Sequence, residues 1–179
     1  MLILGALIYR VIPAKNDGHK LKLKIGHALT MMAAFVLMVI GLQAAFDSHN
    51  LARDKENKPA PKPNMYTLHS WVGILAATLF GCQWLLGFLA FLFPKFSGDI
   101  RALLLPFHQY LGSAILVLAA AAALLGHLEK SIWSNKEYSK YNPEAVLVNI
   151  TGILIVLFVM GVTFILSKFS TEHPNKDKY

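Results

Sequence analysis

The stretch LHSWVGILAATLFGCQWLLGFLAFLF, from Leu68 to Phe93, decides the fold of this chain. It has no charged side chain, and a helix of about 20 apolar residues is long enough to cross the hydrocarbon core of a bilayer. Because lipid offers no hydrogen-bond partners to a backbone, such a run must form a helix. We therefore predict an all-α integral membrane bundle. Its four full transmembrane helices are expected at Ala28–Phe46, Trp71–Phe93, Leu103–Gly126 and Ala145–Ser167.

The composition also indicates a membrane protein. Of the 179 residues, 55% are hydrophobic and 15% are charged, whereas about 25% are charged in a soluble domain. A single domain over residues 1–179 is the simplest organisation. Cys82, the only cysteine, lies inside an apolar run, so we expect a small apolar filler and no disulfide.

The first residues, MLILGALI, form an apolar segment that is too short to cross a bilayer. A helix rises about 1.5 Å per residue, so this segment spans only about 12 Å. The segment precedes Arg10, whereas a secretory signal carries its charge before its apolar run. It resembles the last third of a span, and we expect either an incomplete N-terminus or a naturally shortened form.

The net charge of +7 comes from basic residues in the connections between apolar runs. These residues do not form one basic face with interleaved aromatics, which excludes the nucleic-acid-binding class. Connections 9–24, 94–102 and 168–179 hold ten Lys or Arg and four acids, whereas 47–70 and 127–144 hold seven and six. The positive-inside rule therefore predicts that the first set is cytosolic and that residues 169–179 form a cytosolic tail.

Two histidines are expected at the same depth in the membrane. His27 opens its run from the cytosolic side, and His108 lies near the cytosolic start of the third run. His69 enters its run from the other side, so it cannot meet His27 across a core about 30 Å thick. A histidine in a span indicates a functional site, although it can also be a hydrogen-bonded structural residue. Two histidines at one depth on different helices can hold one haem between them.

A haem with protein ligands on both axial positions has no open position for oxygen or substrate, so it would transfer electrons. The many small residues of the runs can either leave room for a macrocycle or serve plain helix packing. His49, beside Asp47 at the other edge of the first run, can meet a metal ion or be a solvated loop residue. His127 is expected to be a solvated loop residue.

Ordered motifs along nearly the whole chain resemble the cytochrome b561 family, the six-helix di-haem transmembrane reductases that use ascorbate. The duodenal and lysosomal animal members are the most similar. The motifs are YRV, KIGHAL, AAFDSHN, MYTLHSWVG, QWLLGF, RALLLPFHQYLG and EAVLVNITG. The resemblance implies that this chain lacks the family's first helix and most of the next. It also makes a homodimer one of the expected partners, since family members often form dimers.

The resemblance further implies the ligands of two haems b. His27 and His108 would be the axial pair of the inner haem, with Arg10 and Lys20 beside it. His69 would be one axial ligand of the outer haem, and the family's second outer ligand lies in the span before YRV, which is absent here. The positions that surround the outer haem correspond to Asn64, Met65, Tyr66, Thr67 and Glu129.

The family binds ascorbate at the cytosolic face through cations that correspond to Lys20, Lys24 and Arg101. Ascorbate is a monoanion, which cations near a low-dielectric boundary attract, although cations that snorkel at a membrane edge would show the same pattern. His49 corresponds to a histidine implicated in binding the ferric substrate. Glu172 stands where close relatives have a lysine, so that contact is not carried over.

The function implied by the resemblance is transmembrane electron transfer. Cytosolic ascorbate would be the donor, two b-type haems the path, and Fe(III) or monodehydroascorbate the acceptor at the outer face. Two alternatives stay open. One is a short non-catalytic membrane form that acts by interaction, and the other is a bundle without haem whose histidines are structural. The sequence does not distinguish the plasma membrane, the endosome or lysosome, and the secretory vesicle.

Overall fold

The computed structural model describes residues 2–12 and 16–171, without the side chains of residues 9, 10 and 168–171. The connection between the second and third helices, residues 51–67, is long and polar. The elements are α1 (Leu2–Val11), α2 (Asp17–Asn50), α3 (Leu68–Phe91), α4 (Gly98–Ser134), the 3-10 turn η1 (Tyr138–Lys140) and α5 (Pro143–Thr171).

The prediction of four membrane-spanning helices is confirmed. By length and composition α2, α3, α4 and α5 can each cross a bilayer, and α1 is the partial helix that the short apolar segment indicated. The predicted connection 9–24 is wrong over its second part, because α2 begins at Asp17 and Asn16 caps it by accepting a hydrogen bond from the His19 backbone. Polar residues beyond the lipid continue a helix once its first turn is capped.

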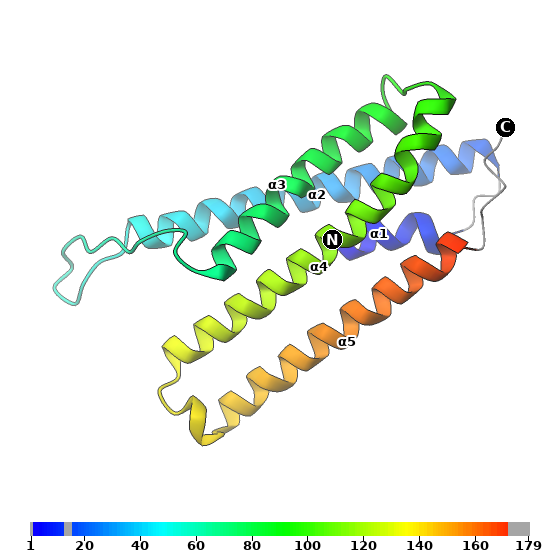
Figure 1. The fold of residues 1–179 in the computed structure, drawn as a ribbon. Coiled ribbons are helices and arrows are strands. Elements are labelled where there is room, and N and C mark those ends of the chain that lie inside the picture. The colour runs from blue at the N-terminus through cyan, green and yellow to red at the C-terminus, as the bar shows by residue number, and fades with distance from the viewer. Residues whose placement is uncertain (1, 13–15, 172–179) are drawn as a thin grey trace.

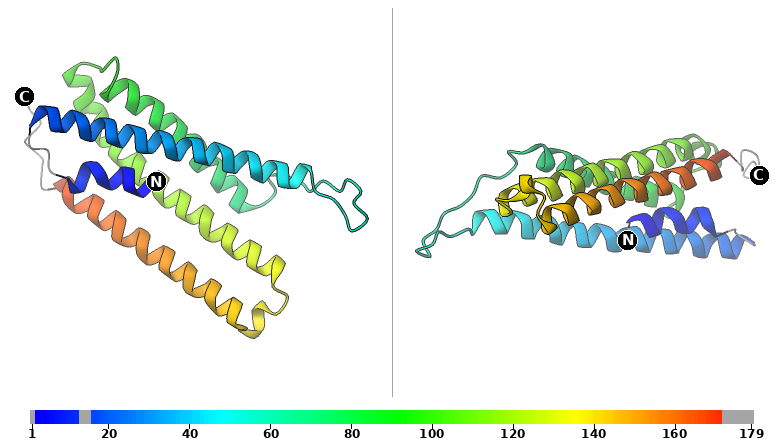
Figure 2. Two further views of the ribbon diagram at one scale, coloured as in Figure 1. Left: turned by 180° about the vertical axis from the view of Figure 1, so that it is seen from behind. Right: turned by 90° about the horizontal axis from the view of Figure 1, so that it is seen from below.

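The helices run antiparallel in chain order, so their ends gather in two places (Figure 1). We call the end where α2 and α4 begin and α5 finishes the inner end, and the opposite end the outer end. Helix α1 lies between α2 and α5 at the inner end, as both views in Figure 2 show. This arrangement places His27 and His108 each ten residues into a helix that starts at the inner end.

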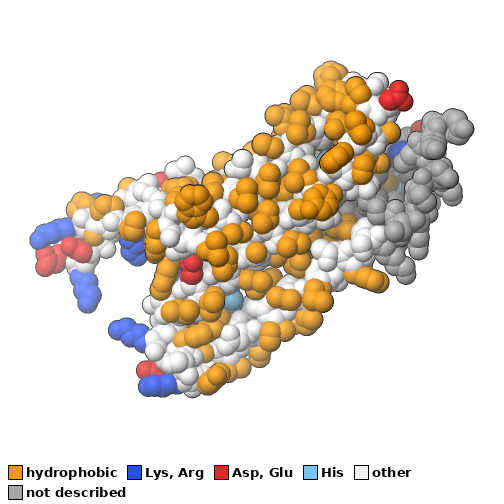
Figure 3. Space-filling model, viewed as in Figure 1, with side chains coloured by type: hydrophobic (Ala, Val, Ile, Leu, Met, Phe, Trp, Pro, Cys, Tyr) orange, Lys and Arg blue, Asp and Glu red, His pale blue; other side chains and the backbone are white. Residues whose placement is uncertain are grey.

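The surface of the bundle is apolar along its length and charged at its ends (Figure 3). Large hydrophobic side chains are exposed on every long helix, including Leu37, Leu86, Val117 and Leu157. Cys82 lies on this exposed surface of α3 rather than in the interior. Because soluble proteins do not expose such continuous apolar surface, lipid must cover it, and the chain is a multi-pass integral membrane protein.

Glycines allow the helices to approach one another closely. A Cβ atom added at Gly81 of α3 would lie 3.0 Å from the Phe35 ring on α2, and one at Gly73 would lie 4.0 Å from the Ala122 Cβ on α4. Small residues at such points are how membrane helices gain packing contacts. Gly41 of α2, in contrast, has no atom within 4 Å of its added Cβ.

This difference predicts unequal effects of two matched substitutions. Gly81→Val should drive a branched side chain into Phe35 and lower the free energy of unfolding by about 1–3 kcal/mol. Gly41→Val should be close to neutral, since open space surrounds that position. Thermal unfolding of the detergent-solubilised protein measures both, and equal midpoints for the two variants would contradict the packing of α2 on α3.

Candidate haem-binding site

His27 and His108 meet between α2 and α4. Their ring centroids lie 6.4 Å apart, and the ring planes are inclined by 70°. Phe91 of α3 packs edge-on against His108 with a centroid distance of 5.3 Å. The two histidines that share one predicted depth are therefore brought together, and an aromatic ring from a third helix closes one side.

The spacing of this pair fits a haem iron. Metal–imidazole bonds are about 2.0–2.1 Å long, and each ring nitrogen lies about 1.1 Å from its ring centroid, so two axial imidazoles place their centroids roughly 6.3 Å apart. The observed 6.4 Å agrees with this value. Imidazole is also a normal axial ligand of haem iron, so the donor set and its spacing both suit the group.

Hydrogen bonds fix which nitrogen of two histidines is available. The Nδ1 of His27 lies 2.7 Å from the Gly5 carbonyl oxygen on α1, and the Nδ1 of His69 lies 2.8 Å from the Ala122 carbonyl oxygen on α4. A carbonyl oxygen only accepts, so Nδ1 carries the proton in both rings. Nε2 is then the basic nitrogen that can ligate iron, which is the arrangement found at metal-bound histidines generally.

Helices α3 and α4 hold their histidines by the same contact. The His69 ring of α3 lies against Gly126 of α4, where an added Cβ would be 2.6 Å from the ring. The His108 ring of α4 lies against Gly87 of α3, where an added Cβ would be 2.8 Å away. Each glycine therefore leaves the space that its partner helix fills with an imidazole.

The two contacts reflect a spacing that is repeated in the sequences of α3 and α4, which was not among the predictions from the sequence. In HSWVGILAATLFGCQWLLG and HQYLGSAILVLAAAAALLG the histidine is followed by glycine at the fourth and eighteenth positions. Eighteen residues are a whole number of helical turns at 3.6 residues per turn, so histidine and distal glycine share one face. Comparing the two helices by histidine-to-glycine spacing, rather than by overall similarity, would have revealed the pair.

The residues expected around the outer haem tie three helices together. Asn64 bonds to His49 and Asn50 at the end of α2, and the Met65 carbonyl accepts from the Trp71 indole of α3 at 2.9 Å. Tyr66 stacks on Trp133 of α4. Thr67 caps α3 by accepting a hydrogen bond from the Ser70 backbone, and the half-buried His69 is the second residue of that helix. The segment Asn64–Thr67 therefore lies over the outer end near His69.

The cations expected near the inner haem lie on the same helices as His27 and His108, toward the inner end. Lys20 and Lys24 precede His27 by seven and three residues on α2, and these spacings place all three on one face of the helix. Arg101 precedes His108 by seven residues on α4, and its Nε donates to the Phe96 carbonyl at 3.0 Å. The remaining guanidinium N–H groups can meet an anion.

The site predicted from the sequence also includes Arg10, Glu129 and His49. The Arg10 side chain lies outside the described residues, as does Glu172. Glu129 is half-buried on α4, three residues after Gly126 and so toward the same face. His49 bonds to Asn64. Within the described parts of the chain no group of three or more His, Cys, Asp or Glu is arranged to hold a metal ion.

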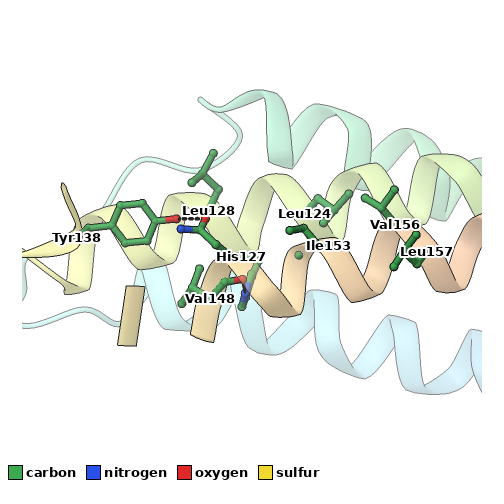
Figure 4. A pocket seen from close by; sticks show the side chains of 10 residues that line it. Leu124, His127, Leu128, Tyr138, Val148, Ile153, Val156 and Leu157 are labelled. Atoms are coloured by element: carbon green, nitrogen blue, oxygen red, sulfur yellow. Dashed lines mark hydrogen bonds between the residues drawn. The ribbon is translucent and has the colours of Figure 1, made fainter. Parts of the chain in front are cut away.

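A separate cavity lies between α4 and α5. It has a volume of about 390 Å³ and is mostly apolar, with His127 and Tyr138 at one end (Figure 4). His127 donates from Nε2 to the Val148 carbonyl at 3.2 Å, and Tyr138 bonds to Asn149. His127 is therefore part of the α4–α5 packing, and the prediction that it is a solvated loop residue is wrong.

The fold defines a class of protein, namely integral membrane helix bundles, and the paired histidines of different helices make it a candidate for haem binding. A family comparison specifies this class further, because the profile of eukaryotic cytochrome b561 matches residues 3–134. The chain belongs to the cytochrome b561 family, and with it to the b-type haem proteins.

Known relatives extend the match to most of the chain. The lysosomal membrane ascorbate-dependent ferrireductase of Bos taurus is 42% identical over 174 residues, which cover 95% of this chain and 62% of the relative. The human protein of the same description is also 42% identical, with 95% and 68% covered. The transmembrane ascorbate-dependent reductase of Ovis aries is 38% identical, with 94% and 63% covered. This chain thus spans roughly two thirds of the length of these relatives.

The contact between His108 and Gly87 predicts a specific loss of haem. Gly87→Ala places a methyl group where the His108 ring lies, and displacement of a ligand or its support typically weakens metal binding about 10- to 100-fold. Gly73→Ala on the same helix meets its nearest atom at 4.0 Å and should retain haem. The pyridine haemochrome assay gives haem per chain, and equal content in both variants would show that the contact of Gly87 with His108 does not support haem binding.

Proposed function

We propose that this chain carries electrons across a membrane from cytosolic ascorbate to Fe(III) or monodehydroascorbate at the outer face. The observation that carries the proposal is the His27–His108 pair, whose 6.4 Å separation suits two axial ligands of one iron. Membership in the cytochrome b561 family supports the choice of haem b. The descriptions of the relatives as ascorbate-dependent reductases support the donor, and the ferrireductase description supports the ferric acceptor.

The inner haem is assigned to His27 and His108, and His69 is assigned as one ligand of an outer haem. When bound, haem b supplies a centre that takes up and releases one electron at a time. Along α4, His108 and the His69 anchor at Ala122 are 14 residues apart, which is about 21 Å of helix. One centre beside each face is therefore needed to cover the thickness of the membrane.

At the inner end, Lys20, Lys24 and Arg101 are assigned to the ascorbate monoanion. Their positive charges lie where polar helix ends adjoin the apolar span, so an anion gains Coulomb energy that bulk water would screen. Loss of one electron and one proton converts the monoanion into monodehydroascorbate. The face shared by Lys20, Lys24 and His27 brings this donor beside the histidine pair.

At the outer end, the segment Asn64–Thr67 and Glu129 are assigned to the surroundings of the outer haem, and His49 to the ferric substrate. The hydrogen bond from His49 to Asn64 supports this placement, since it links the candidate substrate histidine to the segment beside His69. A single electron reduces Fe(III) to Fe(II) there, which balances the electron lost by ascorbate.

The assignment of the inner haem is tested by His108→Ala. This change removes one of two axial ligands, so the ascorbate-reducible absorbance of the inner haem should be lost, while a haem held at His69 should persist. The measurement is the reduced-minus-oxidised spectrum of the purified protein. If all haem bands survive, the pairing is wrong. If the unsubstituted protein shows no ascorbate-reducible bands, the bundle without haem is the correct alternative.

The ascorbate site is tested by comparing two lysines of α2. Lys24→Ala removes a charge three residues from His27, so the ascorbate concentration for half-maximal reduction should rise about 5- to 10-fold, or about 1 to 1.4 kcal/mol. Lys22→Ala removes the same charge from another face of the helix and should change it little. Stopped-flow absorbance measures both at unchanged haem content. Equal effects would indicate that Lys24 is only a membrane-edge cation.

A further inference from the structure

Gln83 is a buried polar side chain that takes no part in the proposed ligand set. It lies in the middle of α3 and is only 8% exposed. Its Nε2 donates to the backbone carbonyl of His108 on α4 at 2.6 Å. An added Cβ at Gly112 would lie 3.6 Å from this nitrogen, so Gly112 leaves space for the amide. An amide inside a span costs free energy unless it is bonded, and this one is bonded to an axial histidine residue.

Trp84, the next residue of α3, makes the corresponding bond to α2. Its indole Nε1 donates to the Ala28 carbonyl of α2 at 3.1 Å, and its ring stacks on Phe88 with a centroid distance of 5.4 Å. Ala28 directly follows His27. Consecutive side chains of a helix point about 100° apart, so neighbouring residues of α3 reach the two helices that carry the inner histidine pair.

The outer site has no such bonds at the equivalent positions. In the repeat shared by α3 and α4, Gln83 and Trp84 correspond to Ala122 and Ala123. Ala122 is also 8% exposed, but a methyl side chain has no donor. The polar contacts are therefore a property of the inner site and not a general requirement of packing α3 against α4.

We propose that Gln83 and Trp84, the donor pair, position His27 and His108 and thereby tune the inner haem. The inference rests on the proposed function, since it assumes haem between these histidines. The backbone of His108, and that of Ala28 next to His27, are each bonded from α3, which supplies no ligand to the pair. Axial ligand geometry and surrounding hydrogen bonds are the levers by which a protein sets the reduction potential of haem. Both residues are positioning residues, because they act through the histidines.

The test compares two substitutions with a matched control. Gln83→Leu removes the amide at nearly constant volume, and Trp84→Phe removes the indole N–H but keeps an aromatic ring. Thr30→Val is the control, because Thr30 lies three residues from His27 and its hydroxyl donates to the Gly26 carbonyl of its own helix. The readouts are the electron paramagnetic resonance spectrum of the ferric protein and a redox titration, both on the haem-loaded full chain.

A loosened axial histidine donates less to ferric iron, so the reduced form should be favoured in both substituted proteins. We expect the ratio of reduced to oxidised inner haem at a fixed potential to rise at least 3-fold, which corresponds to about 28 mV at 59 mV per tenfold change. The g-values of the inner haem should shift as well. Thr30→Val should leave the ratio and the g-values unchanged.

Two results would overturn the inference. One is a spectrum and titration that match the control in both variants, and the other is a lower unfolding temperature with unchanged g-values, which would indicate helix packing alone. If Gln83→Leu does not fold, Trp84→Phe decides by itself. The proposed function has its own test, because it fails if His108→Ala keeps all haem bands. The two failures are therefore distinguishable.

Discussion

The bond from an imidazole Nδ1 to a backbone carbonyl on another helix is the interaction on which the site depends. His27 makes it to Gly5 and His69 makes it to Ala122. In lipid the ring needs a partner for its N–H group, and the helix that supplies the carbonyl must come close enough to provide one. The same bond joins two helices, fixes the tautomer and leaves Nε2 as the nitrogen that can bind a metal, so folding and the proposed haem ligation share one requirement.

Helices α3 and α4 form a scaffold in which a histidine of one helix packs against a glycine of the other twice. Each helix provides a histidine in its first third and a glycine eighteen residues later, and antiparallel pairing brings histidine and glycine together at two places. The two ends then differ in their surroundings. The inner end adds α1 and α2 with lysines and a second histidine, whereas the outer end is crossed by the segment Asn64–Thr67. The two histidine sites thus have nearly the same helix contacts but different polar surroundings.

Much of this arrangement followed from the sequence, because lipid limits the choices. Apolar run lengths predicted four spans, and the chain direction of those spans predicted that His27 and His108 share a depth. The full length of α2 did not follow, since its first turns are polar and lie beyond the lipid. The contacts of Gly87 and Gly126 with imidazoles did not follow either, because they depend on which faces of two helices meet. For the same reason nothing in the sequence singled out Gln83.

The eighteen-residue spacing also has a consequence for how such chains can vary in length. A helix that carries only a lipid-facing surface tolerates an inserted or deleted residue, because lipid accepts any apolar face. In α4, one inserted residue between His108 and Gly126 would rotate one contact by about 100° relative to the other. His108 and Gly126 could then not both face α3. Between these two residues, only insertions or deletions that preserve the helical phase keep both contacts. The loops outside can lengthen freely.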